Sequence, residues 1–132
     1  MDLCYSSQPI NIDEYLAFLD HAGWHVITKE AAEVGLSNSV ETYRAESDGK
    51  LVGIARVNGD SAIYCYLQDM IVHPDYQGLG VGGGLLTFLL QHYRKKHSGM
   101  LFLMSAGGKA GFYEKYGFVR RPDDSPGMML SR

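Results

Sequence analysis

The amino-acid sequence predicts an α/β (α+β) fold in which about four helices flank one mixed, mostly antiparallel sheet of six to seven strands. Short apolar or alternating segments between turn signals are typical of antiparallel strands. A strand, helix, strand crossover from Tyr64 to Met104 requires one parallel pair. The length of 132 residues and the apolar content of 45% fit a single core. We therefore expect one domain over residues 1–132.

The N-terminal part of the chain predicts one strand and two helices. The strand covers Leu3–Tyr5. Asn11 is a good N-cap, and Glu14 completes a capping box ahead of apolar residues at helical spacing that run up to Gly23. Thr28–Gly35 predicts a second, shorter helix that a threonine caps and a glycine ends.

Three strands joined by tight turns follow. Glu41–Glu46 and Leu51–Val57 are joined through Asp48-Gly49, a dipeptide that strongly favours a β-hairpin. Ala62–Val72 is a longer segment rich in Tyr, Ile and Val, which favour strands, and a proline stands just beyond it. These segments predict an antiparallel meander.

The C-terminal half predicts two helices and three strands. Leu79–His97 has its apolar residues on one helical face, and Met100–Met104 is an apolar strand. Lys109–Tyr116 predicts a short helix between glycine turns. Phe118–Arg120 and Gly127–Leu130 complete the expected sheet.

The charge distribution indicates an anionic ligand in the second half of the chain. The net charge is −3, yet all 15 acidic residues lie outside Tyr76–Tyr113, where four basic residues stand. The one short basic cluster, Arg94–Lys96, is explained by the macrodipole of a helix that ends there. We therefore expect no nucleic-acid partner.

No segment predicts a membrane span, a secretory signal or a metal site. No run reaches the roughly 18 to 20 apolar residues that a span needs, and the first residues lack a basic start with an apolar stretch. Cys4 and Cys65 have no CxxC or Cys/His ligand spacing and stand in apolar segments, which favours buried free thiols. The expected protein is cytoplasmic and binds neither membrane nor metal.

Five glycines stand between Gly78 and Gly84, where the strand that ends at Val72 turns into the long helix. A helix N-terminus has unpaired N–H groups and a partial positive charge, so glycines there let an anion such as phosphate reach the bare backbone. No acidic side chain occupies this first turn. Close packing of the helix on the sheet is the alternative reason for one or two of these glycines.

Two nucleotide-binding motifs fit this stretch poorly. Gly78–Gly83 satisfies GxGxxG, but a dinucleotide site has its glycines directly after the strand. It also has an acidic residue about 20 positions later, where Met100–Met104 has none. The Walker motif fails because no GK[ST] follows the glycines.

A third pattern fits closely. Gln77–Gly82 (QGLGVG) matches Q/R-x-x-G-x-G/A, Val72-His73-Pro74 precedes it, and Gly111–Phe118 follows it. In these motifs and in its order of elements, the chain resembles the GNAT superfamily of acetyl-CoA-dependent N-acetyltransferases. The chain departs from the family at Ser105–Gly108, where many members carry an asparagine after the fifth strand.

The resemblance implies acetyl-CoA as the acyl donor. The backbone of the fourth strand would pair with the pantetheine arm where the fourth and fifth strands splay apart. The glycine loop would hold the pyrophosphate, and one aromatic ring would pack near the cofactor. The implied cofactor-binding residues are Met70, Ile71, Val72, Gln77, Gly78, Leu79, Gly80, Val81, Gly82, Gly83 and Phe112.

The resemblance also implies catalytic roles for two residues. Tyr113 stands where the family has the tyrosine that protonates the departing CoA thiolate, a role that suits a neutral phenol; a core aromatic is the alternative. Asp69 would relay the proton of the amine through water or orient the acceptor, and a structural carboxylate is the alternative. A β-bulge, common in this strand of the family, would re-aim Asp69. His73 stands beside a proline, which favours a turn residue over a base.

The resemblance implies a primary amine as acceptor, bound between the first two helices and the meander. Trp24, His25, Tyr43, Tyr64 and Tyr66 are the candidate wall residues, with ordinary core positions as the alternative. Aromatic walls and an acidic N-terminal half favour a small cationic amine that reacts directly with acetyl-CoA in a ternary complex. A non-catalytic acyl-CoA-binding or sensing module and a protein lysine or N-terminal acetyltransferase stay open, as does a homodimer.

Overall fold

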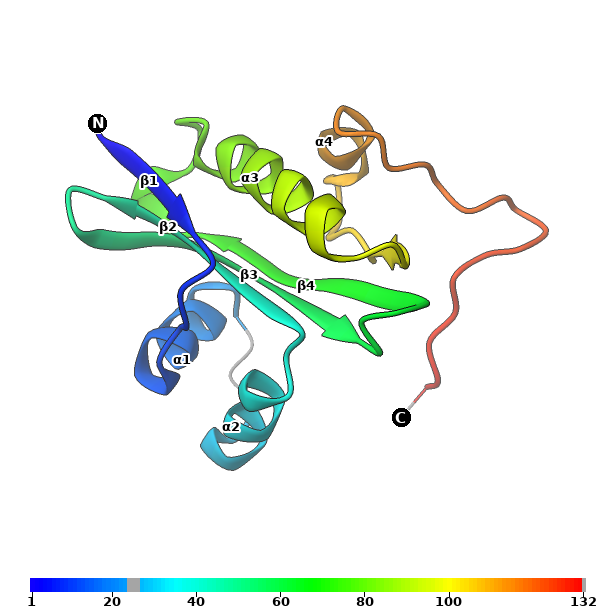
Figure 1. The fold of residues 1–132 in the computed structure, drawn as a ribbon, viewed down its shortest axis with the longest axis horizontal. Coiled ribbons are helices and arrows are strands. Elements are labelled where there is room, and N and C mark those ends of the chain that lie inside the picture. Colours follow the sequence, from blue (N-terminus) through cyan, green and yellow to red (C-terminus); the bar gives the residue numbers. More distant parts are fainter. Residues whose placement is uncertain (24–26, 132) are drawn as a thin grey trace. The chain divides into compact units, whose positions relative to one another are not determined.

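The computed structural model describes residues 1–23 and 27–131 of the chain. Two compact units make up the chain, Met1–Phe102 and Leu103–Arg132. Among the described residues, the first unit carries one five-stranded sheet and three α-helices, and the second carries one short helix (Figure 1).

The described elements follow the predicted order up to the last helix. Those of the first unit are β1 (Leu3–Ser6), α1 (Ile12–His21), α2 (Lys29–Ser37), β2 (Glu41–Ser47), β3 (Lys50–Gly59), β4 (Tyr64–Val72), the 3₁₀ turn η1 (Pro74–Tyr76), α3 (Val81–Lys96) and β5 (Met100–Phe102). The second unit holds α4 (Ala110–Glu114). The predicted helices and the first five predicted strands are therefore confirmed to within a few residues.

The strands lie in the order β1-β2-β3-β4-β5. The first three neighbouring pairs are antiparallel, and β4–β5 is parallel because α3 crosses over between them. The β2–β3 hairpin turns at Asp48 and Gly49, whose φ values of 51° and 81° are both positive, as a two-residue type I′ turn requires. The predicted mixed, mostly antiparallel sheet is confirmed.

The prediction of six to seven strands is wrong, since the described residues form five. Phe118–Arg120 and Gly127–Leu130 are irregular. A strand forms where its backbone groups find a partner strand, and the strand propensity of a short segment does not supply one. The residues Val119 and Leu130 are 87% and 91% exposed.

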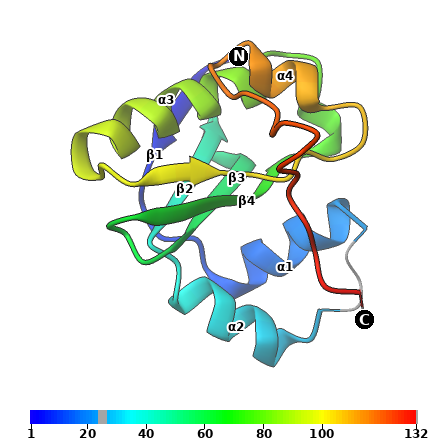
Figure 2. The ribbon, with the colours of Figure 1, turned by 90° about the vertical axis from the view of Figure 1, so that its right-hand side faces the viewer.

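Helices cover both faces of the sheet, with α3 on one face and α1 and α2 on the other (Figure 2). Side chains alternate between these faces along each strand. Gly53 faces α3, because a Cβ built there would lie 3.3 Å from Val81 and 3.4 Å from Ala45 of β2. Its neighbour Ile54 belongs to the core on the α1 side.

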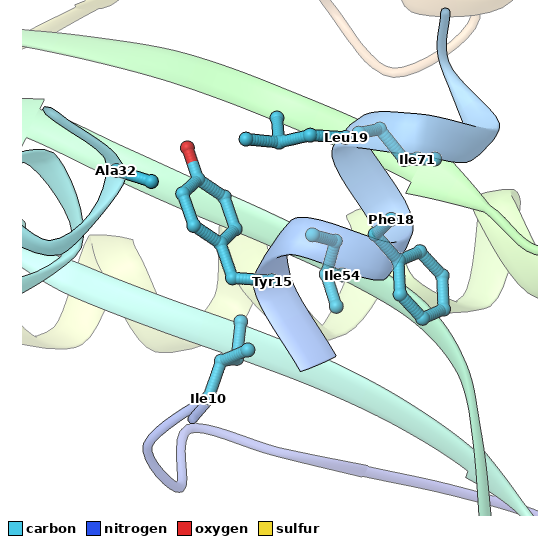
Figure 3. Packing of buried hydrophobic residues seen from close by; sticks show 7 residues of the cluster. All are labelled: Ile10, Tyr15, Phe18, Leu19, Ala32, Ile54 and Ile71. Atoms are coloured by element: carbon cyan, nitrogen blue, oxygen red, sulfur yellow. The ribbon is translucent and has the colours of Figure 1, made fainter. Parts of the chain in front are cut away.

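The core on the α1 side is a cluster of seven buried side chains (Figure 3). Its members are Ile10, Tyr15, Phe18, Leu19, Ala32, Ile54 and Ile71. They come from α1, α2, β3, β4 and the approach to α1. Burial of one large apolar side chain stabilises the fold by about 1.5–3 kcal/mol. The cluster therefore fixes α1 against the C-terminal part of β4.

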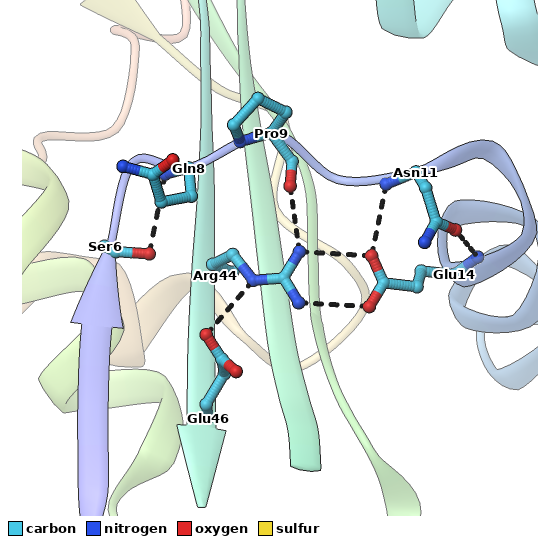
Figure 4. Close-up of polar contacts among 7 residues, drawn as sticks. All are labelled: Ser6, Gln8, Pro9, Asn11, Glu14, Arg44 and Glu46. Carbon is cyan, nitrogen blue, oxygen red and sulfur yellow. Dashed lines mark hydrogen bonds and ion pairs between the residues drawn. The ribbon is translucent and has the colours of Figure 1, made fainter. Parts of the chain in front are cut away.

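An ion pair fastens the first turn of α1 to the sheet (Figure 4). The predicted capping box is present: Asn11 Oδ1 accepts from Glu14 N at 2.8 Å, and Asn11 N donates to Glu14 Oε1 at 3.1 Å. The same carboxylate accepts two bonds from Arg44 of β2, at 3.1 and 3.0 Å. The hydrogen bonds from Arg44 lower the pKa of Glu14.

The prediction of buried thiols holds for Cys65 and is wrong for Cys4. Cys4 is exposed because β1 lies at the edge of the sheet. None of the helices that the structure describes is both long and apolar enough to cross a membrane. Over the same residues, no three His, Cys, Asp or Glu side chains are grouped to hold a metal ion.

Candidate functional site

β5 pairs only with the start of β4. The pairing joins Tyr64–Tyr66 of β4 to Met100–Phe102. The rest of β4, Leu67–Val72, continues past the paired residues and stays paired to β3 on its other side. We call the β5-facing backbone of Leu67–Val72 the open edge. An extended ligand can add to such an edge as a further strand.

A β-bulge interrupts β4 within the open edge, as predicted. The register between β3 and β4 shifts between Ile54 and Arg56, so that Asp69 and Met70 oppose a single β3 residue. Asp69 has a φ of 54°, in the left-handed region that a non-glycine residue enters at a cost of about 1–3 kcal/mol. The bulge turns the Asp69 side chain to the same face as Arg56.

The direction of the β4 backbone groups follows from its hydrogen bonds. His73 N donates to a β3 carbonyl at 2.8 Å, so His73 turns its backbone toward β3. Because these groups alternate along a strand, Ile71 also faces β3, while Met70 and Val72 face the open edge. Gln77 Nε2 donates to the outward carbonyl of Val72 at 3.1 Å. Of the three β4 residues predicted to pair with the cofactor, Ile71 thus turns its backbone away from the open edge.

Glycines shape the turn that leads from η1 into α3. Gly78 and Gly80 have φ values of 77° and 84°, and Gly80 is the N-cap of α3. Among the described residues, no side chain caps this end, and its first turn carries no acid. Gly84 N donates to Gly80 O at 3.0 Å, so the N–H groups of Val81–Gly83 lie before the first intrahelical bond. This end of α3 suits an anionic ligand.

Packing explains one glycine of the cluster. A Cβ built on Gly84 would overlap the Tyr5 hydroxyl and lie 2.5 Å from Tyr5 Cζ. The packing alternative therefore holds for Gly84. A Cβ on Gly78 or Gly80 would meet nothing within 4 Å, so the positive φ values account for those two glycines.

The Asp69 carboxylate lies in a buried polar network whose other members sequence reasoning missed. Arg56 Nε donates to Asp69 Oδ2 at 2.8 Å, and the Tyr15 hydroxyl donates to the same oxygen. The side chains of Arg56 and Asp69 are 12% and 6% exposed. Burial and the bond to Asp69 raise the pKa of Tyr15, which keeps the phenol a donor. Arg56 is the only charged residue of its predicted strand, a signal that it needs a buried acidic partner.

His73 organises the turn after β4, in agreement with the role predicted for it. Its Nδ1 accepts from Asp75 N at 3.1 Å at the start of η1. Its ring lies 4.7 Å from that of His21 and 6.4 Å from that of Phe18, measured between centroids. These contacts hold the turn against the C-terminal end of α1.

Of the three predicted acceptor-wall residues that the structure describes, Tyr43 lies apart from Tyr64 and Tyr66. Tyr43 is fully buried under α3, with its hydroxyl 2.8 Å from an imidazole nitrogen of that helix. The prediction that it lines a pocket beside α1 and α2 is wrong, because strand alternation points it to the other face. Tyr64 is 57% exposed, and the buried Tyr66 hydroxyl bonds to no described residue. Trp24 and His25 lie outside the described residues.

Tyr113 belongs to α4 of the second unit. Its ring packs edge-on against Phe112 and Phe118, with centroid separations of 5.1 and 5.8 Å. Burial raises the pKa of Tyr113 above its ordinary value, so the phenol is neutral at physiological pH. A neutral phenol can donate a proton to a leaving group.

Known proteins share both the sequence pattern and the fold. The profile of the acetyltransferase (GNAT) domain family matches residues 38–120. An uncharacterized N-acetyltransferase ycf52 of Pyropia yezoensis is 31% identical over 127 residues, which span 93% of this chain and 73% of the relative. A probable acetyltransferase of Staphylococcus aureus has the same fold with a TM-score of 0.86 and 26% identity, over 99% of this chain and all of its own.

A GNAT family acetyltransferase of Streptococcus pneumoniae gives a TM-score of 0.81 at 27% identity, over 99% of this chain and 97% of its own. The family match covers the open edge, the glycine turn and Tyr113. The resemblance seen in the sequence motifs is confirmed by these matches. The chain belongs to the GNAT family of N-acetyltransferases.

Proposed function

We propose that the protein transfers the acetyl group of acetyl-CoA directly to the primary amine of a small molecule. One observation carries the proposal: the open edge of β4 leads through η1 into the glycine-led end of α3, all within one unit. The pantetheine arm would add to Met70 and Val72 like a strand, and the pyrophosphate would bind the N–H groups of Val81–Gly83.

Acetyl-CoA as the donor has support from a relative of the same fold. A GNAT family acetyltransferase of Elizabethkingia anophelis, solved with acetyl-CoA bound, has a TM-score of 0.70 to this chain at 20% identity. Gln77 to Gly83 fit the same kind of ligand, because their glycines leave the helix end bare and no acidic side chain competes for it.

The proposed step forms one C–N bond and breaks one C–S bond. The lone pair of the neutral amine attacks the thioester carbonyl carbon, and a backbone N–H of the open edge stabilises the resulting oxyanion. When the intermediate collapses, the CoA thiolate leaves and would take a phenol proton, the role that the family resemblance gives to Tyr113. The proton of the attacking amine passes to water, from which the phenol recovers its own. Phe112 would pack near the cofactor.

The acceptor class is the finer part of the proposal. A rice protein named serotonin N-acetyltransferase 2, chloroplastic, is 32% identical over 93 residues, which supports a small aromatic amine. Protein acceptors appear in the names of histone acetyltransferase TAP1 of Glycine max and the ribosomal-protein-S18-alanine N-acetyltransferase of Escherichia coli. Because the rice relative is named chloroplastic, the plastid is a second compartment to test beside the predicted cytoplasm.

Calorimetric titration with acetyl-CoA, with NAD and ATP as controls, tests the donor. We expect binding of acetyl-CoA alone. Thiol release is then measured with serotonin, a histone H3 peptide and a peptide that begins with alanine. Turnover of serotonin alone supports the small-amine proposal, and turnover of a peptide alone overturns it. Binding of NAD or ATP in place of acetyl-CoA would mean that the glycine turn holds a different ligand.

A non-catalytic acyl-CoA-binding module is the second candidate. The observation that favours it is Ser105–Gly108, which lacks the asparagine that many family members carry. Such a module would bind acetyl-CoA in the titration and release no thiol with any of the three acceptors.

A further inference from the structure

We infer that Asp69 is a positioning residue, whose buried carboxylate, held by Tyr15 and Arg56, fixes the bulge of β4 so that the backbone N–H of Met70 faces the open edge. The inference rests on the proposed function, because the N–H matters where a thioester carbonyl lies against that edge. It assigns Asp69 a different task from the proton relay that the family resemblance implies.

The bonds of the Asp69 carboxylate do not suit a proton relay. Its Oδ2 accepts from both Arg56 Nε and the Tyr15 hydroxyl, and the side chain is 6% exposed. A general base must reach the reacting amine directly or through one water. Here the positive charge of Arg56 lies 2.8 Å away and already compensates the carboxylate.

The partners of Asp69 are themselves fixed from several elements. Tyr15 belongs to the buried core of α1, and the Arg56 guanidinium lies 5.5 Å from the centroid of its ring. Arg56 Nη1 also donates to Asn58 Oδ1 at 2.8 Å, Gly35 O at 3.0 Å and Ser39 Oγ at 3.3 Å. A strained backbone persists where its surroundings over-determine it. The network therefore explains how Asp69 keeps its left-handed conformation.

The bulge decides which backbone groups reach the open edge. Before it, Tyr64 O accepts from Asp60 N at 3.0 Å, so even-numbered residues turn toward the β3 side. After it, the donation from His73 N to β3 shows that odd-numbered residues do. The extra residue at Asp69 thus reverses the alternation. Without it, Met70 would turn its N–H into the sheet, and the open edge would lose its first donor after the bulge.

The test uses acetyl-CoA labelled with ¹³C at the thioester carbonyl as the probe. A hydrogen bond to that carbonyl polarises it and moves its NMR resonance downfield on binding. We expect this shift with the wild-type protein. Asp69→Asn should keep it, since asparagine tolerates the left-handed region and its amide oxygen can accept the same two bonds. Asp69→Gly should lose it, because glycine allows the conformation without holding it.

We expect kcat to rank the variants in the same order as the ¹³C shift does. Asp69→Gly should lower kcat about 100-fold or more, the loss typical of a misplaced oxyanion donor, with less effect in Asp69→Asn. Tyr15→Phe removes only one of the two donors to Asp69 and should lose part of the shift. Tyr15→Phe therefore still tests the inference if Asp69→Gly fails to fold.

Glu14→Gln is the matched control. Its ion pair with Arg44 also ties α1 to the sheet, but at β2, and this variant should keep the wild-type shift. The inference is overturned if Asp69→Gly keeps the shift, if Asp69→Asn loses it as fully as Asp69→Gly, or if wild-type protein binds acetyl-CoA without a shift. Absence of acetyl-CoA binding in the calorimeter would overturn the proposed function, which is a different outcome from the loss or retention of the shift.

Discussion

At the scale of single residues, Tyr113 separates catalysis from cofactor binding. Tyr113→Phe removes one hydroxyl and keeps the ring between Phe112 and Phe118. Loss of a general acid should lower kcat about 10²- to 10⁴-fold in the thiol-release assay. The Kd for acetyl-CoA should stay nearly unchanged in the calorimeter. Tyr116→Phe is the matched control, since Tyr116 also packs against Phe112, with 5.3 Å between the ring centroids. Wild-type turnover in Tyr113→Phe would remove Tyr113 from the mechanism.

The pKa of Tyr113 also sets a pH limit for activity. Burial raises this pKa above the ordinary value of 10.0, and the acid must be protonated to act. Activity should therefore not decline through Tyr113 ionisation until the pH exceeds about 10. A kcat profile measured from pH 7 to 10.5 checks this, with Tyr113→Phe as the reference. An alkaline limb near pH 8 that Tyr113→Phe abolishes would contradict it.

At the scale of elements, the start of α3 combines a binding glycine and a packing glycine. Gly84→Ala would overlap the Tyr5 ring and should lower the free energy of unfolding by about 1–3 kcal/mol, with unchanged affinity for acetyl-CoA. Gly80→Ala meets open space but must take a φ of 84°, so it should lower acetyl-CoA affinity at a stability cost of about 1–2 kcal/mol. Urea unfolding and calorimetry measure the two quantities. Equal losses of affinity in both variants would refute this division.

Local sequence signals predicted the helices and strands better than they predicted which distant segments and side chains contact one another. Asn11 with Glu14 and Asp48 with Gly49 define a helix start and a hairpin by local chemistry, and both form as predicted. The network around Asp69 joins residues 13 and 54 positions apart, Arg56 and Tyr15, which no local pattern connects. The prediction of two C-terminal strands was wrong for the same reason, because a strand depends on a partner elsewhere in the chain.

At the scale of the whole molecule, the order of elements predicts the fold class, but it does not predict which face of the sheet each side chain occupies. Tyr43 was expected beside α1 and α2 and lies under α3, since one residue of register reverses the direction of every side chain in a strand. The open edge depends on where β5 stops pairing with β4, after Phe102. The family motif predicted the splay, and the structure adds that Met70 and Val72 face it.

The stability of the whole molecule should fall in acid partly through the ion pair of Glu14 with Arg44. The hydrogen bonds from Arg44 lower the pKa of Glu14 below its ordinary value of 4.5. The folded state thus binds the Glu14 proton less readily than the unfolded state does. The stabilisation is therefore fully present above about pH 4.5 and is lost as the pH falls through the lower, folded value. A double-mutant cycle of Glu14→Gln and Arg44→Met should give a coupling of about 0.5–1 kcal/mol at pH 7 that vanishes near pH 2.5. Glu41, whose pKa is also lowered on balance, keeps part of the acid dependence in Glu14→Gln. A coupling that is equal at both pH values would show that packing of the Arg44 stem, and not the charge on Glu14, ties α1 to the sheet.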